Sequence, residues 1–151
     1  MQWHLQHFAQ LSPTILYHVM QLRSAVFVVE QNCVYLDADG VDVKCYHLYT
    51  TNKNNQLIAY CRIAPPHVIY PGNSSIGRVV IHNSTRGTGI GKLLMAQAIH
   101  HTVQLYPTVP ILIGAQAYLT KFYTNLGFVV QGNTYIEDGI PHIKMLYTPC
   151  S

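Results

Sequence analysis

The sequence has few charged residues and no region where charge of one sign is dense. Charged side chains make up 10% of its 151 residues, and the nine Lys and Arg are scattered singly between Arg23 and Lys144. Non-specific binding of nucleic acid needs a dense basic surface. The net charge of +3 therefore does not indicate a nucleic-acid partner, and we expect none.

Long apolar runs and closely spaced cysteines are also missing. No apolar run approaches the ~18 residues of a membrane span, and the first residues lack the basic and apolar regions of a signal peptide. The four cysteines (Cys33, Cys45, Cys61 and Cys150) show no Cys-x-x-Cys spacing. We therefore expect reduced thiols, no metal site, no membrane association and a cytoplasmic protein.

Acidic residues are absent from the middle of the chain, residues 43–136. The six carboxylates fall in two segments: Glu30, Asp37, Asp39 and Asp42, then Glu137 and Asp138. Asp-x-Asp-Gly and Glu-Asp-Gly are ordinary turn sequences, so turn formation is one reading of this pattern. A functional acidic surface is the other.

The apolar pattern predicts alternating strands and helices in a single domain over residues 1–151. Hydrophobic residues make up 49% of the chain, enough for a sizeable core. Alternation predicts strands at 2–10, 45–50, 57–64, 76–81, 111–115, 128–131 and 142–147. Helical spacing predicts helices at 12–30, 93–106 and 118–126.

A glycine-rich segment, Arg86-Gly87-Thr88-Gly89-Ile90-Gly91-Lys92, lies between a predicted strand and a predicted helix. Glycines let backbone N–H groups converge, and the helix N-terminus adds partial positive charge, so phosphate or pyrophosphate is the expected ligand. Arg86 and Leu93 stand where a Walker A loop needs glycine and Ser or Thr. Lys92 stands where a dinucleotide fingerprint needs its third glycine. A purely structural turn remains the alternative.

This R-G-x-G-x-G loop resembles the coenzyme A pyrophosphate loop of the GNAT acetyltransferase superfamily. The segment 122–128, in which Tyr123 precedes Gly127-Phe128, is similar to a late helix-to-strand motif of that family. Two more segments, 22–31 and 137–142, look like its ElaA-type branch. The resemblance implies an α/β GNAT fold: a mixed, mostly antiparallel twisted sheet of about seven strands, flanked by helices and splayed between the fourth and fifth strands.

The resemblance also implies acetyl-CoA as cosubstrate and direct attack of a primary amine in a ternary complex. The backbone of Val79, Val80 and Ile81 would pair with the pantetheine arm and offer an N–H to the thioester oxygen. The pyrophosphate would be wrapped by the loop, namely Arg86, Gly87, Thr88, Gly89, Ile90, Gly91 and Lys92. Gln116 stands where the family often has an asparagine that contacts the pantetheine amide.

Tyr123 matches the tyrosine that protonates the departing CoA thiolate in related enzymes; packing against the cofactor is its alternative role. A general base is also needed, since an amine with a pKa near ~10.4 is mostly protonated at neutral pH. Glu30 and His142 are the leading candidates and His82 is a third, although a histidine in a strand is often structural. Tyr118 and Arg23 could line the same wall.

In the implied fold, both acidic segments flank the acceptor entrance. We therefore expect the six carboxylates to form a negative mouth for a cationic acceptor such as a polyamine, amino sugar, lysine side chain or peptide N-terminus. Two alternatives are a non-catalytic acetyl-CoA sensor and a toxin-type enzyme acting on aminoacyl-tRNA, although the latter would need a basic surface. Exposed strand edges leave room for a homodimer.

Overall fold

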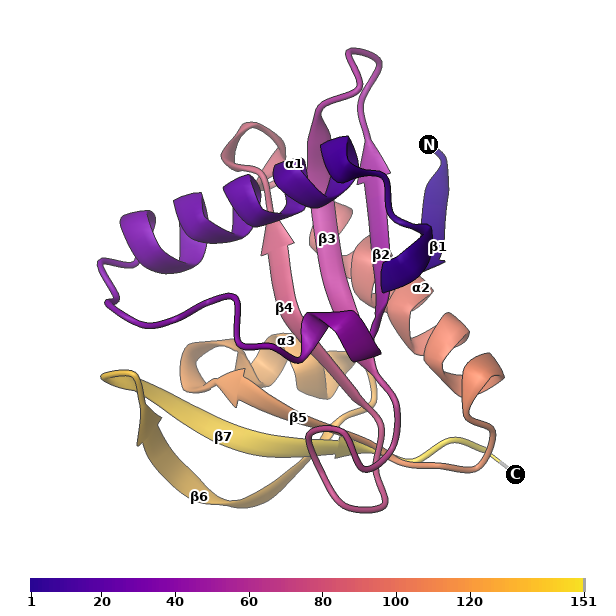
Figure 1. The fold of residues 1–151 in the computed structure, drawn as a ribbon. Helices are drawn as coiled ribbons and strands as arrows, with labels where there is room; N and C mark the ends of the chain where they lie inside the picture. Colours follow the sequence, from indigo (N-terminus) through magenta and orange to yellow (C-terminus); the bar gives the residue numbers. More distant parts are fainter. Residues whose placement is uncertain (151) are drawn as a thin grey trace.

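The computed structural model describes residues 1–150 as two sheets with helices on both faces (Figure 1). The first sheet holds, in spatial order, β1 (Trp3–His7), β2 (Tyr46–Thr51), β3 (Leu57–Ala64) and β4 (Ser75–Ile81). The second holds β5 (Ile111–Gln116), β7 (Ile140–Tyr147) and β6 (Val129–Glu137). All neighbouring strands within the two sheets are antiparallel. The predicted α/β fold, with about seven mostly antiparallel strands, is confirmed.

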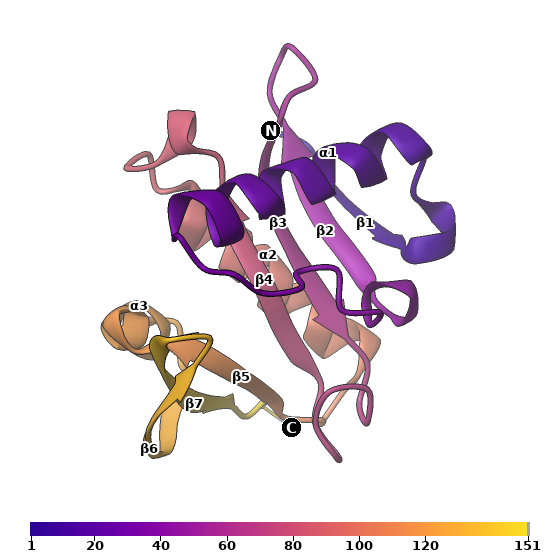
Figure 2. The ribbon, with the colours of Figure 1, turned by 60° about the vertical axis from the view of Figure 1, so that its left-hand side comes forward.

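The two sheets separate between β4 and β5, as the family resemblance implied. They meet at one point, where Ser74 forms a parallel bridge with Ile111 and its carbonyl accepts a hydrogen bond of 2.9 Å from the Leu112 N–H. Beyond this point the strands diverge, and Figure 2 shows the second sheet turning away from β4. The edge of β4 that faces β5 is thereby left open toward its C-terminal end.

The first helix begins where the sequence predicted. The Ser12 hydroxyl accepts a hydrogen bond from the Ile15 N–H, and a proline opens helix α1 (Pro13–Arg23). The chain then continues as the π-helix η2 (Ser24–Glu30). The single helix predicted to Glu30 is therefore two segments of different pitch, and π segments are frequent at functional sites.

The other helices lie close to their predicted positions. Helix α2 (Ile90–Leu105) starts three residues before the predicted 93, and α3 (Thr120–Asn125) follows a short 3-10 turn. Four 3-10 turns connect the elements: η1 (Phe8–Gln10), η3 (Asp42–Lys44), η4 (Asn83–Thr85) and η5 (Ala117–Leu119). Within residues 1–150, no helix is long and apolar enough to cross a membrane.

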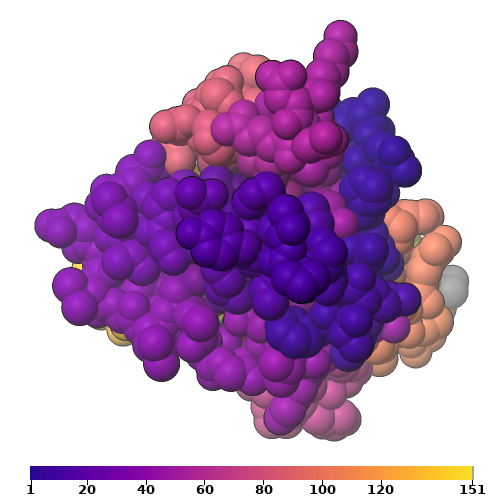
Figure 3. All heavy atoms as spheres, turned by 45° about the horizontal axis from the view of Figure 1, so that its top comes forward, coloured from indigo at the N-terminus to yellow at the C-terminus, as the bar shows by residue number. Residues whose placement is uncertain are grey.

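Two apolar clusters hold the sheets and helices together. The larger one joins α2 and α3 to β3 and the second sheet, with Leu94, Met95, Phe128 and Met145 at its centre. The smaller one packs α1 against the other face of the first sheet. Because helices cover both faces, every residue of β3 is buried. Helix α1 and the segment after it form one continuous face of the molecule (Figure 3).

Candidate active site

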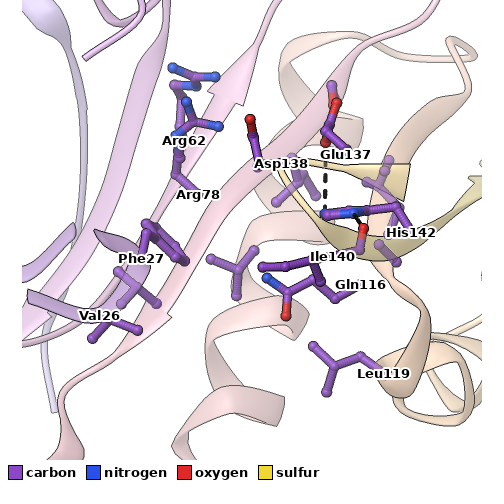
Figure 4. A pocket seen from close by; sticks show the side chains of 18 of the residues that line it. Val26, Phe27, Arg62, Arg78, Gln116, Leu119, Glu137, Asp138, Ile140 and His142 are labelled. Atoms are coloured by element: carbon purple, nitrogen blue, oxygen red, sulfur yellow. Dashed lines mark hydrogen bonds and ion pairs between the residues drawn. The ribbon is translucent and has the colours of Figure 1, made fainter. Parts of the chain in front are cut away.

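A cavity of about 820 Å³, here called the central cavity, lies where β4 turns away from β5. It is lined by β4, β5, η2, α3 and the turn between β6 and β7. One end, the loop end, is lined by Ile81, Arg86 and Leu119. The other, the charged end, is lined by Arg62, Arg78, Glu137 and Asp138 (Figure 4).

Strand β4 borders this cavity with an irregular stretch of backbone. Tyr60 of β3 pairs with Val80, whereas Arg62 pairs with Gly77, so β4 carries an extra residue. Within this bulge Arg78 has φ +50, a conformation that costs about 1–3 kcal/mol and is concentrated at functional sites. The predicted backbone-binding residues, Val79, Val80 and Ile81, all line the cavity.

The glycine loop has the backbone geometry that an anion site needs. Gly87 and Gly89 have φ values of +79 and +84, and nothing lies within 4 Å of a Cβ built on either residue. Backbone conformation, not lack of space, therefore requires glycine at both positions. Helix α2 begins directly after Gly89, which caps it without a side chain, so the first-turn N–H groups have no side-chain partner. These groups, with Arg86 at the cavity wall, fit a pyrophosphate.

The remaining loop residues lie outside the central cavity. The Thr88 hydroxyl donates to the Thr85 carbonyl, and Ile90 packs in the larger apolar cluster. Lys92 is exposed on α2 beside a shallow hollow that Phe122 helps to line. The predicted roles of these three residues stay predictions.

Tyr123 and Gln116 line the central cavity, as expected of donor-binding residues. Tyr123 is only 6% exposed, and its ring makes edge contacts with Phe122 and Phe128. This burial raises the pKa of its phenol well above the usual value. Gln116 ends β5, and its amide donates to the Gln31 side chain over 3.4 Å.

Glu30 lies at the cavity wall but is held by the glycine loop. Both carboxylate oxygens accept hydrogen bonds from the Arg86 guanidinium, at 2.9 and 2.8 Å. The hydrogen bond from Arg86 lowers the pKa of Glu30. A carboxylate so engaged is a weaker proton acceptor.

His142 faces the cavity from β7 with a defined tautomer. Its Nδ1 lies 2.7 Å from the Ile140 carbonyl oxygen, to which it donates, so in the neutral ring Nε2 keeps the lone pair. Nε2 lies 3.7 Å from the Glu137 carboxylate (Figure 4). The ring stacks on Tyr135. His82, the third candidate base, does not line the cavity; it caps η4 through Ser84.

The prediction that all six carboxylates form a negative mouth is wrong for four of them, because Glu30 pairs with Arg86 and the three aspartates pair with arginines of their own. Three aspartates pair with three arginines in one network: Asp37, Asp39 and Asp42 with Arg23, Arg62 and Arg78. Of the two roles considered for Arg23, lining the acceptor wall or packing, the structure shows the second: it is fully buried, 2.9 Å from Asp37 and 2.7 Å from Asp42. Buried carboxylates are paired in this way because desolvation of a lone charge is costly.

A comparison with protein-family models finds that the family described as "Acetyltransferase (GNAT) domain" matches residues 37–149. The chain belongs to the GNAT acetyltransferase family. ElaA of Escherichia coli is 40% identical over 95% of this chain and 94% of its own length. A UPF0039 protein of Synechocystis sp. is 41% identical over 96% of this chain and 94% of its own length.

Solved structures agree with this assignment. The crystal structure of an acyl-CoA N-acyltransferase from Pseudomonas aeruginosa has a TM-score of 0.91 and 39% identity, covering 98% of this chain and 100% of that one. The crystal structure of E. coli ElaA has a TM-score of 0.90 and 40% identity, covering 97% and 98% of the two chains. The expected GNAT family and ElaA-like branch are confirmed, and family membership supports acyl transfer from an acyl-CoA.

Sequence reasoning missed several residues of this GNAT cavity. Arg62, Arg78 and Tyr35 line it, and the Cys33 thiol donates over 3.2 Å to the Asp138 carbonyl across its opening. These residues lie far apart in the chain and belong to no local motif. The one local signal was Asp37-Ala38-Asp39, because two carboxylates so close together need cationic partners if they are buried.

Proposed function

We propose that the protein transfers the acetyl group of acetyl-CoA to a primary amine by direct attack in a ternary complex. The observation that carries this proposal is the central cavity, which connects Arg86 of the anion-binding loop to Tyr123 and to His142. One continuous space can hold a donor and an acceptor side by side. Holding two reactants in attack geometry supplies much of the rate enhancement of such reactions.

The donor would lie along β4 toward the glycine loop. Acetyl-CoA supplies an activated thioester when bound. The open edge of β4 at Val79, Val80 and Ile81 offers backbone groups to the pantetheine arm, and an N–H there can stabilise developing charge on the thioester oxygen. The α2 N-terminus and Arg86 provide positive charge for the pyrophosphate. Gln116, which lines the same cavity, would contact a pantetheine amide.

Tyr123 is our candidate for the acid that protonates the thiolate. Its raised pKa keeps the proton on the phenol at neutral pH, where it is available for transfer. A phenol of raised pKa is a weaker acid in water, but the same buried surroundings also disfavour a thiolate. Proton transfer depends on the difference between the pKa of the phenol and the pKa of the CoA thiol. Burial raises both values, so it changes their difference much less than either value alone.

His142 is the stronger of the two candidate bases. Its Nε2 lone pair faces the Glu137 carboxylate, which would stabilise the imidazolium formed when the amine loses its proton. Glu30 is tied to Arg86, and pyrophosphate binding would place further anionic charge close to it. We therefore propose His142 as the general base and Glu137 as the residue that positions it. Glu30 would instead hold Arg86 of the glycine loop in place.

The test is thiol release from acetyl-CoA, measured with a panel of polyamines, aminoglycosides, amino acids and peptides. We expect at least one amine to raise the rate far above the acceptor-free background, with an acetylated product of matching mass. Tight acetyl-CoA binding without acceleration by any amine would instead support a sensor of the cosubstrate.

A further inference from the structure

We propose that the acceptor carries a carboxylate beside its amino group, and that Arg78 binds this carboxylate. This inference rests on the proposed function, because it names the acceptor class of the same cavity. Its starting point is that the charged end has walls of opposite sign. Arg62 and Arg78 lie on the wall formed by β3 and β4, and Glu137 and Asp138 face them from the turn between β6 and β7 (Figure 4).

The Arg78 guanidinium is fixed in place with one side free. Its Nε lies 2.9 Å from the Asp37 carboxylate as an ion pair without hydrogen-bond geometry, and its Nη2 donates to the Asp37 carbonyl at 3.1 Å and to Asp39 at 3.3 Å. The Tyr35 ring lies 5.6 Å from the guanidinium carbon. Nη1 forms no hydrogen bond within residues 1–150, although the residue lines the cavity. A guanidinium held on three sides is preorganised to bind an anion with the fourth.

The backbone also indicates a purpose for this side chain. Arg78 has φ +50 inside a strand, a conformation that a glycine would adopt at lower cost. The bulge that contains it directs the side chain to the cavity wall. Pairing with Asp37 and Asp39 requires a cation at this position, and the strained backbone places the remaining face of that cation at the cavity.

Arg62 provides a second, buried positive charge on the same wall. It is 3% exposed and donates from Nη1 and Nη2 to Asp39, and from Nη1 to Asp42. Its Nε, like that of Arg78, is buried and has no hydrogen-bond partner within the part of the chain that the structure describes. Because this atom is not accessible, Arg62 would act on a bound carboxylate through its charge, and direct contact would fall to Arg78 Nη1.

Local charge then selects among acceptors. Arg23, Arg62 and Arg78 are balanced by Asp37, Asp39 and Asp42, while Glu137 and Asp138 add two negative charges opposite them. A dianionic group such as phosphate would be repelled by this surplus, and a plain diamine would leave Arg78 Nη1 unused. An amino acid or a similar compound satisfies both walls, with its amino group toward Glu137 and His142 and its carboxylate on Arg78.

The experiment compares amines that differ only in the carboxylate. The pairs are lysine and cadaverine, ornithine and putrescine, and tyrosine and tyramine, each assayed by thiol release from acetyl-CoA. We expect kcat/KM to be roughly 10- to 100-fold higher for the carboxylate-bearing member of the pairs that react. In Arg78→Met this ratio should fall toward one while turnover of the carboxylate-free amine persists, which shows that the variant is folded.

Arg86→Met is the matched control, since it removes another arginine from the same cavity at the loop end. It should raise KM for acetyl-CoA and leave the acceptor ratio unchanged. Equal or faster turnover of the carboxylate-free amines by the wild type would overturn the acceptor class while leaving acetyl transfer intact. A ratio that survives in Arg78→Met would overturn the role of Arg78. Failure of every amine to react would refute the proposed function itself.

Discussion

At the scale of single residues, Tyr123 combines a packing role with the proposed proton transfer. The ring is held between Phe122 and Phe128, while the residue lines the cavity. Tyr123→Phe keeps the ring and removes the proton, so kcat should fall about 100-fold with little change in KM for acetyl-CoA. Steady-state kinetics with the best amine of the panel would measure both values. Full turnover with unchanged cosubstrate affinity would remove Tyr123 as the acid.

Two variants distinguish between the candidate bases His142 and Glu30. His142→Gln should lower kcat/KM for the amine by about 100-fold, because the proton acceptor is lost. Glu30→Gln should change kcat by less than about 3-fold, because Arg86 already engages that carboxylate. KM for acetyl-CoA in Glu30→Gln should stay the same or fall, since Arg86 becomes free for the pyrophosphate. A larger loss of activity in Glu30→Gln than in His142→Gln would instead identify Glu30 as the general base.

At the scale of elements, the glycine loop allows a comparison within a few residues. Gly89→Ala forces a Cβ into a φ of +84 and should lower the free energy of unfolding by about 1–2 kcal/mol. Gly91 lies in the first turn of α2, where a Cβ would meet only Ile81 Cγ1 at 3.9 Å. Gly91→Ala should therefore be neutral or stabilising by up to about 1 kcal/mol. Urea unfolding of both variants measures the difference, and equal losses would contradict this account of the loop.

The elements themselves were largely predictable because their signals are local. Strand β3 has the predicted bounds, and Ser12-Pro13 marked the start of α1. The π-helix after Arg23 was not predictable, since its apolar spacing is compatible with an ordinary helix. The β4 bulge was also missed: Arg78 at φ +50 follows from pairing with β3 and from cavity geometry, not from its neighbours in sequence.

At the scale of the whole molecule, the sequence allowed more specific predictions for the proposed donor side of the cavity than for the proposed acceptor side. The glycine loop and Tyr123 belong to motifs whose spacing can be read along the chain. The proposed acceptor wall combines Arg62, Arg78 and Asp39, which meet only after β3, β4 and the segment after η2 have packed together. Opposite charges scattered along a sequence give no sign of which of them will pair. Only Glu137 and Asp138, on the wall opposite these arginines, therefore remain as an excess of negative charge at this end of the cavity.

This network also sets how the fold responds to acid. Burial alone would raise the pKa of Asp42, but hydrogen bonds and charges from Arg23 and Arg62 outweigh burial and lower it. Burial lowers the pKa of His47, whose ring bonds the Tyr60 hydroxyl at 2.7 Å and the Asp42 carbonyl at 2.9 Å. Both groups bind a proton more readily in the unfolded chain, so both contribute stability that is lost as pH falls.

The two contributions fall in different pH windows. An unfolded histidine titrates near ~6.5 and an unfolded aspartate near ~3.9, so stability should begin to fall below about pH 6.5 through His47 and fall again below about pH 4 through Asp42. The slope in the first window should approach about 1.4 kcal/mol per pH unit. His47→Gln should be less stable at neutral pH and should show a smaller slope between about pH 6.5 and 4.5, where His101, whose pKa burial also lowers, still contributes. His100→Gln, at an exposed position on α2, should keep a slope close to that of the wild type. Urea unfolding across pH 3 to 8 measures these slopes. If His47→Gln kept the wild-type slope between about pH 6.5 and 4.5, another group would control stability in that range.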